Sequence, residues 1–187
     1  MLSVIIPTLD SERALVPTLA ALVPGATDGL ISEVLVVDGG SRDVTAAVAD
    51  VAGCNVLTLR AQLAKRLKAG AASARAPWLM FLRPGSILDA PWTGEARRFV
   101  EHGSPQGRAA VFRRGLPGQS GLREALSFLA ATLCAPPRAE QGLLIPKRFY
   151  EEIGAHSEQA SDPEADLLRR LGRRRIVRLT TSVFTPS

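Results

Sequence analysis

The sequence predicts an α/β fold built on a mostly parallel sheet with helices on both faces. Short apolar runs rich in β-branched residues alternate with amphipathic segments, which is the pattern of repeated strand–helix units. The runs are apolar along their whole length, as expected for strands buried on both faces. In the first half these predicted strands cover residues 3–7, 33–38, 55–59 and 78–82.

Helices are expected in the intervals between these strands. Proline is tolerated only in the first turn of a helix, so the first helix is expected to begin near Val16, just before Pro17. Asp43 is placed to cap a second helix over residues 44–51. A third helix, rich in Ala, Leu and Lys, is expected over residues 62–75. Connections between parallel strands should be right-handed crossovers.

Beyond residue 90 the pattern is looser, but it still alternates. The predicted elements are a helix over 91–102, a strand over 109–113, a flexible loop over 114–121, a helix over 122–133, a short strand over 143–145, a helix over 147–153, a helix capped by Ser161 or Asp162 that ends at Leu171, and a closing strand over 176–184. A chain of 187 residues with 46% hydrophobic content can bury one core, so residues 1–187 are expected to form a single domain.

The composition favours an anionic partner and excludes several classes of protein. The net charge is +5, and much of the excess comes from the cluster Arg169, Arg170, Arg173, Arg174, Arg175 and Arg178. This cluster is either a solvated face or a contact for phosphates or the inner face of an anionic membrane. With only 5% aromatic residues and no recognition motif, nucleic-acid binding is a poor fit.

Targeting and metal-binding signals are weak. No basic leader precedes the first apolar run, and no apolar stretch approaches the length of a membrane span, so we expect a cytoplasmic protein. Cys54 and Cys134 lie far apart, outside any disulfide framework or zinc motif. His102 and His156 are isolated, and we expect both at the surface.

Ligands of open α/β sheets bind beyond the carboxyl ends of the strands, which here carry polar residues. Asp38 ends the apolar second strand and is followed by Gly39 and Gly40. A carboxylate in such a place needs hydrogen-bond donors, which a ring imide N–H or a ribose hydroxyl would supply. Asp38 is therefore interpreted as a nucleoside contact, with capping of its own turn as the alternative. Thr8 and Asp10 follow the first strand at the same edge.

The sequence resembles family 2 glycosyltransferases of the GT-A fold. The resemblance rests on SVIIPTLD (3–10) and EVLVVDGGSRDVT (33–45), and it continues in order through residues 64–82, 141–154 and 164–179. It implies that Pro7, Thr8 and Asp38 surround the base of a nucleotide sugar, most simply a UDP-sugar. It also implies inverting transfer to an acceptor hydroxyl, with residues 1–90 as the nucleotide-binding half and 91–187 as the acceptor-side half.

The sequence departs from the family pattern directly after the fourth strand. The family places there an aspartate motif that holds Mg²⁺ or Mn²⁺ on the diphosphate, but this chain has Arg83-Pro84-Gly85. A hard cation needs oxygen ligands, and an arginine repels it, so no metal ligands are assigned. Arg83, with Lys65 or Lys68, could neutralise the diphosphate instead, which would make the enzyme independent of metal. Alternatively, the chain is a non-catalytic GT-A protein that binds a nucleotide or a partner, or a basic interaction module that uses its arginine cluster.

The general base of an inverting transfer has to be a carboxylate close to the acceptor hydroxyl. The resemblance assigns this role to Glu164, in the stretch Asp162-Pro-Glu-Ala-Asp166, with Asp166 as the second candidate. Acidic residues also stabilise the N-terminus of a helix, so a purely structural role for either residue is the alternative.

Overall fold

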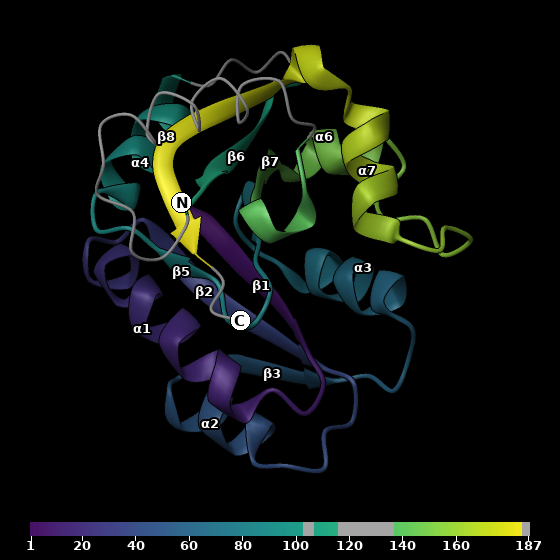
Figure 1. Ribbon diagram of the computed structural model, residues 1–187. Helices are drawn as coiled ribbons and strands as arrows, with labels where there is room; N and C mark the ends of the chain where they lie inside the picture. Colours follow the sequence, from purple (N-terminus) through teal and green to yellow (C-terminus); the bar gives the residue numbers. More distant parts are fainter. Residues whose placement is uncertain (103–106, 116–136, 185–187) are drawn as a thin grey trace.

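The structure is a computed structural model and describes residues 1–102, 107–115 and 137–184. Its strands form one eight-stranded sheet in the order β3-β2-β1-β4-β7-β6-β8-β5 (Figure 1). The strands are β1 (Leu2–Thr8), β2 (Ile31–Asp38), β3 (Asn55–Thr58), β4 (Trp78–Phe81), β5 (Ile87–Leu88), β6 (Ala109–Arg114), β7 (Leu143–Pro146) and β8 (Ile176–Phe184). The sheet runs without a break through both halves of the sequence.

The sheet is parallel in its first half and mixed in its second. β1 pairs in parallel with β2 and β4, and β2 pairs in parallel with β3, as the sequence predicts. β7 lies between β4 and β6 and is antiparallel to both. β8 runs parallel to β6 and antiparallel to β5, a short strand that was not predicted. The carboxyl ends of β1, β2 and β4 therefore lie side by side.

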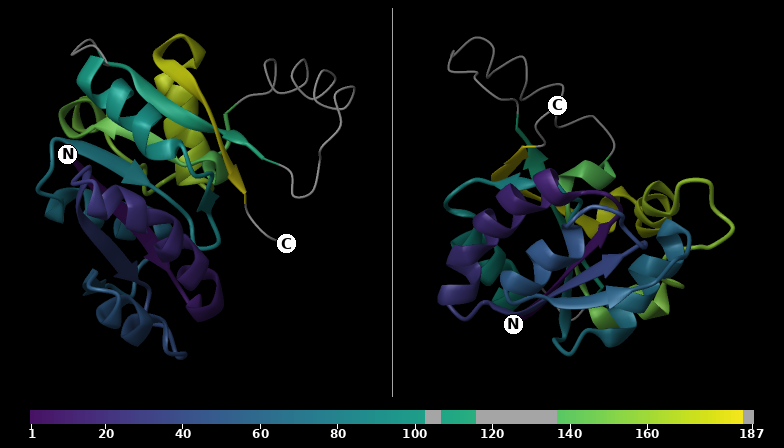
Figure 2. Two further views of the ribbon diagram at one scale, coloured as in Figure 1. Left: turned by 90° about the vertical axis from the view of Figure 1, so that its left-hand side faces the viewer. Right: turned by 90° about the horizontal axis from the view of Figure 1, so that it is seen from below.

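Helices cover both faces of the sheet, which confirms the predicted α/β architecture. One face carries α1 (Glu12–Thr27), α2 (Thr45–Val51) and α4 (Trp92–His102), and the other carries α3 (Leu63–Ser73), α6 (Lys147–Glu152) and α7 (Pro163–Leu171) (Figures 1 and 2). Two short 3-10 helices, η1 (Ala139–Gln141) and η2 (Arg173–Arg175), both contact α7.

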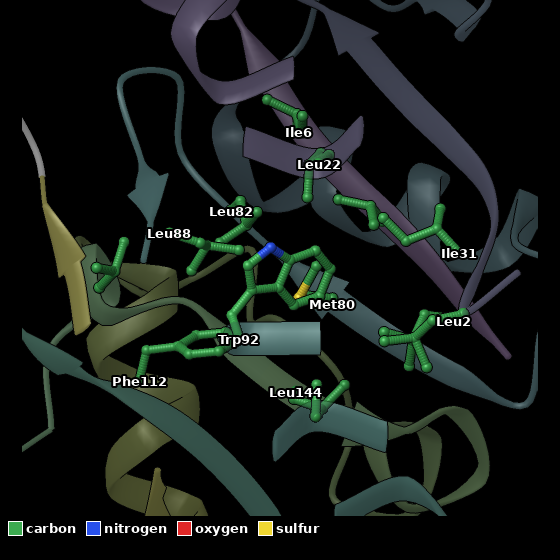
Figure 3. Packing of buried hydrophobic residues seen from close by; sticks show 14 of the residues in the cluster. Leu2, Ile6, Leu22, Ile31, Met80, Leu82, Leu88, Trp92, Phe112 and Leu144 are labelled. Carbon is green, nitrogen blue, oxygen red and sulfur yellow. The ribbon is translucent and has the colours of Figure 1, made fainter. Parts of the chain in front are cut away.

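Trp92 joins the two halves of the chain in the core on the α1 face. Figure 3 shows its indole ring among side chains of β4, β5, β6 and α1, with Phe112 and Leu88 close by. The ring packs edge-on against Phe112 at a centroid distance of 6.5 Å, and its Nε1–H donates to the carbonyl of Ala21 at 3.0 Å. Because the polar end of the indole is satisfied, the whole side chain can be buried.

On the opposite face, a glycine allows α3 to approach the sheet closely. A Cβ at Gly70 would lie 2.7 Å from Cγ2 of Ile5 and 3.0 Å from Cγ2 of Val37. These distances are shorter than normal carbon contacts, so a larger residue would push the helix away from β1 and β2. The close approach brings the first turns of α3 to the carboxyl ends of these strands.

Two predicted boundaries near the site are wrong, and both involve prolines. α1 begins at Glu12, four residues before the predicted start, and includes Pro17. Its first turn is held from outside, because the backbone N–H groups of Ser11 and Glu12 donate to Oγ1 of Thr45 and Oδ2 of Asp43. These bonds offset the one that a proline in the second turn removes.

β1 continues through Pro7 to Thr8 and does not stop at the proline. Pro7 pairs only with Val37 of β2, because the pairing with β4 ends at Ile5. Among the described strands none pairs with Pro7 on the other side, so its missing N–H costs no hydrogen bond of the sheet.

The remaining predicted elements are largely confirmed. The cap of α2 is Val44, one residue later than predicted, although Asp43 still accepts from the N–H of Thr45 at 3.0 Å. The strands predicted over 109–113, 143–145 and 176–184 and the helices over 147–153 and up to Leu171 are present with small shifts of their ends. The helix predicted over 122–133, and the loop over 114–121 apart from its first two residues, lie outside the described residues. Within the described ranges, no helix has both the length and the hydropathy needed to cross a bilayer.

Candidate active site

The loops after β1 and β2 are tied together into one rim at the carboxyl edge of the sheet. The backbone N–H of Gly39 donates to the carbonyl of Thr8 at 2.8 Å. Asp10 accepts from the N–H of Arg42 at 2.7 Å, and its own N–H donates to Oγ of Ser41 at 2.9 Å. The structure thus brings together Thr8, Asp10 and Gly39, which were predicted from separate segments.

Asp38 is almost fully buried at this rim, and protein donors occupy both of its carboxylate oxygens. Oδ1 accepts from the hydroxyls of Thr8, at 3.0 Å, and Ser41; Oδ2 accepts from the N–H groups of Gly40 and Ser41 at 2.9 and 2.8 Å. Burial alone would raise the pKa of Asp38, but these hydrogen bonds outweigh it and lower the pKa. Asp38 therefore stays ionised and fixes the turn after β2.

Arg66 of α3 reaches the same rim and was missed from the sequence. Its Nη1 donates to the carbonyl of Thr8 at 2.5 Å and lies 3.0 Å from the position of a Cβ on Gly39. Nε is buried without a hydrogen-bond partner in the described part of the chain. Burial lowers the pKa of Arg66, and the charge of Asp38 opposes this shift. Its position four residues before Gly70 was the available signal, because that spacing places both on the helix face toward the sheet.

Lys65 and Lys68 lie farther from the rim, on the side of α3 that faces the loop before α7. Their ammonium groups approach Glu158 at 3.7 and 2.8 Å. Lys68 also lines an open pocket of about 480 Å³ between α3 and α7, whose other lining residues include Asp166 and Arg170.

Arg83, directly after β4, pairs with the predicted base Glu164 in the first turn of α7. Nε of Arg83 lies 2.9 Å from Oε2 of Glu164, Nη2 contacts the same oxygen, and Nη1 lies 3.5 Å from Glu140. Burial raises the pKa of Glu164 more than Arg83 lowers it. For Arg83 the balance is reversed: burial alone would lower its pKa, but Glu164 raises it. Arg83, which replaces the metal-binding motif of the family, and Glu164, the predicted base, thus form one ion pair.

Asp166 points elsewhere, because two residues along a helix correspond to a rotation of about 200°. Its carboxylate accepts from Arg169 and, at 2.7 Å, from Arg170, and these bonds lower the pKa of Asp166. Arg170 also donates to the carbonyls of Ile153 and Ala155. Asp166 therefore anchors the loop before α7 and is separated from Glu164.

His156 was expected at the surface, and that expectation is wrong. Its side chain is 2% exposed, packs edge-on against Phe81 and is hydrogen-bonded to the hydroxyl of Tyr150 at 2.8 Å. It lines the large pocket with Asp166 and, on its other side, a cavity of about 10 Å³ with Glu164. An imidazole whose polar atom finds a partner can be buried, and a single sequence does not reveal that partner.

The predicted arginine cluster is divided among α7, η2 and β8. Arg169 and Arg170 pair with Asp166, Arg173, Arg174 and Arg175 are exposed in η2, and Arg178 belongs to β8. The guanidinium of Arg175 lies 5.8 Å from the ring centroid of Phe149, which is a cation–π geometry.

The residues after β4 do not fit a divalent metal ion. Arg83 brings a positive charge to this position, and Pro84 and Gly85 offer no side-chain oxygen. Among residues 1–102, 107–115 and 137–184, no group of three or more His, Cys, Asp or Glu side chains is arranged to hold an ion. Asp89, the nearest carboxylate along the chain, is exposed in the turn before α4.

Known proteins share the fold of this chain and part of its sequence pattern. Residues 3–83 match the family model of glycosyl transferase family 2. No curated protein matches the sequence. Among solved structures, TarS (residues 1–349) from S. aureus has a TM-score of 0.77 at 15% identity, with 98% of this chain and 60% of that chain covered.

Two further structures have the same fold. Glucosyl-3-phosphoglycerate synthase from Mycobacterium tuberculosis, solved with Mn²⁺, UDP and glucosyl-3-phosphoglycerate, has a TM-score of 0.72 at 18% identity, covering 100% of this chain and 72% of that chain. The mannosyltransferase PcManGT from Pyrobaculum calidifontis, solved with GDP-Man and Mn²⁺, has a TM-score of 0.73 at 13% identity, covering 98% and 56%. The chain thus spans only 60% of the TarS 1–349 structure and 56% of PcManGT. The resemblance predicted from the sequence is confirmed: the chain has the GT-A fold, and residues 3–83 carry the sequence pattern of family 2 glycosyltransferases.

Proposed function

We propose that this protein transfers a sugar from a nucleotide sugar, most simply a UDP-sugar, to an acceptor hydroxyl with inversion and without a divalent ion. The observation that carries the proposal is the position of Glu164. It lies buried beside Arg83 at the carboxyl end of β4, so a base and a positive charge meet at the edge where the family pattern of residues 3–83 ends.

The chemistry needs one base and one charge for the leaving group. The acceptor oxygen forms a bond to the anomeric carbon while the bond from that carbon to the diphosphate oxygen breaks. Glu164 takes the acceptor proton, and its raised pKa suits this role because a base works best when its pKa is near the working pH. Arg83 neutralises the negative charge that develops on the diphosphate.

The nucleoside is proposed to lie against the rim formed by Pro7, Thr8, Asp10, Asp38 and Gly39. Arg66 supports this rim, and its charge favours an anionic ligand close by. Lys65 and Lys68 are proposed to contribute at longer range, because each already has Glu158 as a partner.

A second candidate function is nucleotide or partner binding without catalysis. It is favoured by the internal contacts that the site residues already make: Asp38 has four protein donors, and Arg83 contacts two carboxylates. A third candidate is an interaction with an anionic surface, such as the inner face of a membrane, through the exposed Arg173, Arg174 and Arg175.

Isothermal titration calorimetry with UDP-, GDP- and dTDP-sugars tests the proposal, in buffers with Mn²⁺ and with a chelator. We expect binding that is unchanged by the chelator and weakened in Arg83→Ala but not in Arg97→Ala, a remote arginine of α4. Absence of binding for every nucleotide sugar would contradict the proposal. A release assay for the nucleotide then separates the first two candidates, since Glu164→Gln should abolish turnover while the fold is retained.

A further inference from the structure

The two partners of the Arg83–Glu164 ion pair differ in how easily a ligand can reach them. The side chain of Arg83 is 36% exposed, whereas that of Glu164 is 10% exposed. A ligand that enters from solvent can therefore reach the guanidinium, while the carboxylate is nearly covered.

Both Arg83 and Glu164 can form further hydrogen bonds beyond those that they make with each other. Nε and Nη2 of Arg83 both donate to Oε2 of Glu164, so this is not the bidentate geometry in which each oxygen accepts one bond. Oε1 has no hydrogen-bond partner among the described residues, and Glu164 lines the cavity of about 10 Å³, which is about the space of one water molecule. Within the described ranges, Nη1 of Arg83 has the longer contact with Glu140 at 3.5 Å as its one ion-pair contact.

We infer that Arg83 is shared between Glu164 and the diphosphate of the donor, so that donor binding removes the countercharge of Glu164 and makes it a stronger base. This inference rests on the proposed function. A diphosphate offers several anionic oxygens in the fork geometry that a guanidinium prefers, and it competes with the single oxygen of Glu164.

Release of Glu164 has a direct chemical consequence. A buried carboxylate without its positive partner has a higher affinity for protons. The acceptor proton is then taken up more readily once the donor is in place. Before donor binding, Arg83 holds down the proton affinity of Glu164, so Glu164 becomes a stronger base once the donor has bound.

The charges around the pair make donor binding sensitive to pH. Arg83 faces Glu164 and Asp162 at the start of α7 and Glu140 of η1, so acidic groups outnumber it. Arg138 and His156 also line the cavity beside Glu164, but the pKa of His156 is about 3, so it stays neutral above pH 5. Protonation of Glu164 therefore frees Arg83 for the ligand, and the affinity for a diphosphate should rise as the pH falls toward the pKa of Glu164.

Calorimetric titration with UDP-glucose and with uridine in metal-free buffer tests this competition. The phosphates of UDP-glucose do not titrate near neutral pH, and uridine has no group that competes for Arg83. At pH 8 we expect Glu164→Gln to bind UDP-glucose about five- to tenfold more tightly than the wild type, and uridine equally well. As the pH is lowered from 8 toward the raised pKa of Glu164, the wild-type affinity should rise, while that of Glu164→Gln should stay flat. Glu101→Gln, at the far end of α4, is the matched control and should behave as the wild type.

A second measurement needs no variant. Titration of the wild type with UDP-glucose near pH 6, in two buffers of different ionisation enthalpy, should show net proton uptake that uridine does not cause. Equal UDP-glucose affinities of the wild type and Glu164→Gln, or no proton uptake, would overturn the inference and leave nucleotide-sugar binding standing. Failure of the wild type to bind UDP-glucose at all would contradict the proposed UDP-type donor as well.

Discussion

The hydroxyl of Tyr150 lies 2.8 Å from Nδ1 of His156, and both side chains are buried between α6 and the sheet. The same hydroxyl oxygen accepts from the backbone N–H of His156 at 3.3 Å. The contact between this hydroxyl and Nδ1 joins one donor and one acceptor, and the imidazole tautomer sets which atom donates. Burial raises the pKa of Tyr150 to about 12 and lowers that of His156 to about 3, so the pair stays neutral over the physiological range.

This pair should make the stability depend on pH in mildly acidic solution. The unfolded chain protonates His156 near its ordinary pKa of 6.5, but the folded chain does so only near 3. Between these values the unfolded state holds more protons, so the free energy of unfolding falls as the pH falls, by up to about 1.4 kcal/mol per pH unit.

Urea unfolding between pH 7 and 4 measures this slope. In the double variant Tyr150→Phe/His156→Phe, which keeps the packing but removes both polar groups, the slope should decrease by about one proton. His102→Gln, which changes the exposed histidine of α4, should keep the wild-type slope. An unchanged slope in the double variant would contradict the assignment.

Glu95 of α4 holds an irregular stretch of β8, and its removal should destabilise the fold. The β6–β8 register shifts between Val111 and Arg113, and Glu95 accepts from both the N–H and the hydroxyl of Thr180 and of Thr181. Glu95→Gln replaces one accepting oxygen by a donor, so we expect a loss of about 1–3 kcal/mol in the free energy of unfolding.

The charge of Glu95 also gives this effect a pH dependence. Burial alone would raise its pKa, but the bonds from Thr180 and Thr181 lower it overall. The stabilisation is therefore fully present above the ordinary pKa of 4.5 and is lost as the pH falls through the lowered value. Thermal denaturation of the wild type, Glu95→Gln and the exposed control Glu101→Gln should show a deficit only for Glu95→Gln. Equal melting temperatures of the wild type and Glu95→Gln at pH 7 would show that the hydrogen bonds of Glu95 to Thr180 and Thr181 do not stabilise the fold.

Patterns local in the chain predicted most of the fold, because they report burial directly. The apolar runs that correspond to β1, β2 and β4 predicted the parallel half of the sheet. They also predicted that Thr8 and Asp38 lie at its carboxyl edge. These features depend on neighbours within one element or on a general rule for parallel sheets.

Features that depend on distant residues could not be predicted in the same way. Arg83 and Glu164 are 81 positions apart, and their pairing follows from the insertion of β7 beside β4, which places η1 and α7 near the end of β4. The burial of His156 depends on Tyr150 and Phe81, which lie on two other elements. A charged or polar residue is predicted to be exposed from sequence alone, because the partner that allows its burial is not known.

Two buried serines with different surroundings should respond oppositely to loss of the hydroxyl. Ser86, after β4, is buried and its Oγ has no hydrogen-bond partner among the described residues. Ser3 in β1 donates to Glu33 at 2.6 Å and accepts from the N–H of Ala76 at 3.0 Å. We expect Ser86→Ala to be neutral or stabilising by about 1 kcal/mol and Ser3→Ala to be destabilising by about 1–3 kcal/mol. Urea unfolding of both variants measures the difference, and an equal loss in the two would show that Ser86 has a partner.

Replacement of Asp38 by Asn should loosen the rim even without any ligand. The carboxylate accepts four hydrogen bonds, and an amide would point N–H donors at either the two hydroxyls or the backbone N–H groups of Gly40 and Ser41. We expect a loss of about 2–3 kcal/mol in the free energy of unfolding, because some donors lose their acceptor and the charge-assisted bonds disappear.

Amide hydrogen exchange identifies where this loss arises. The N–H groups of Gly40 and Ser41 should exchange faster in Asp38→Asn, whereas the amides of β6 and β7 keep their protection at a temperature where the variant is folded. Asp50→Asn, an exposed change in α2, should alter neither quantity. If Gly40 and Ser41 stay protected in Asp38→Asn while uridine binding is lost, the carboxylate acts on the nucleoside itself; if both change together, it acts by shaping the turn on which the nucleoside rests.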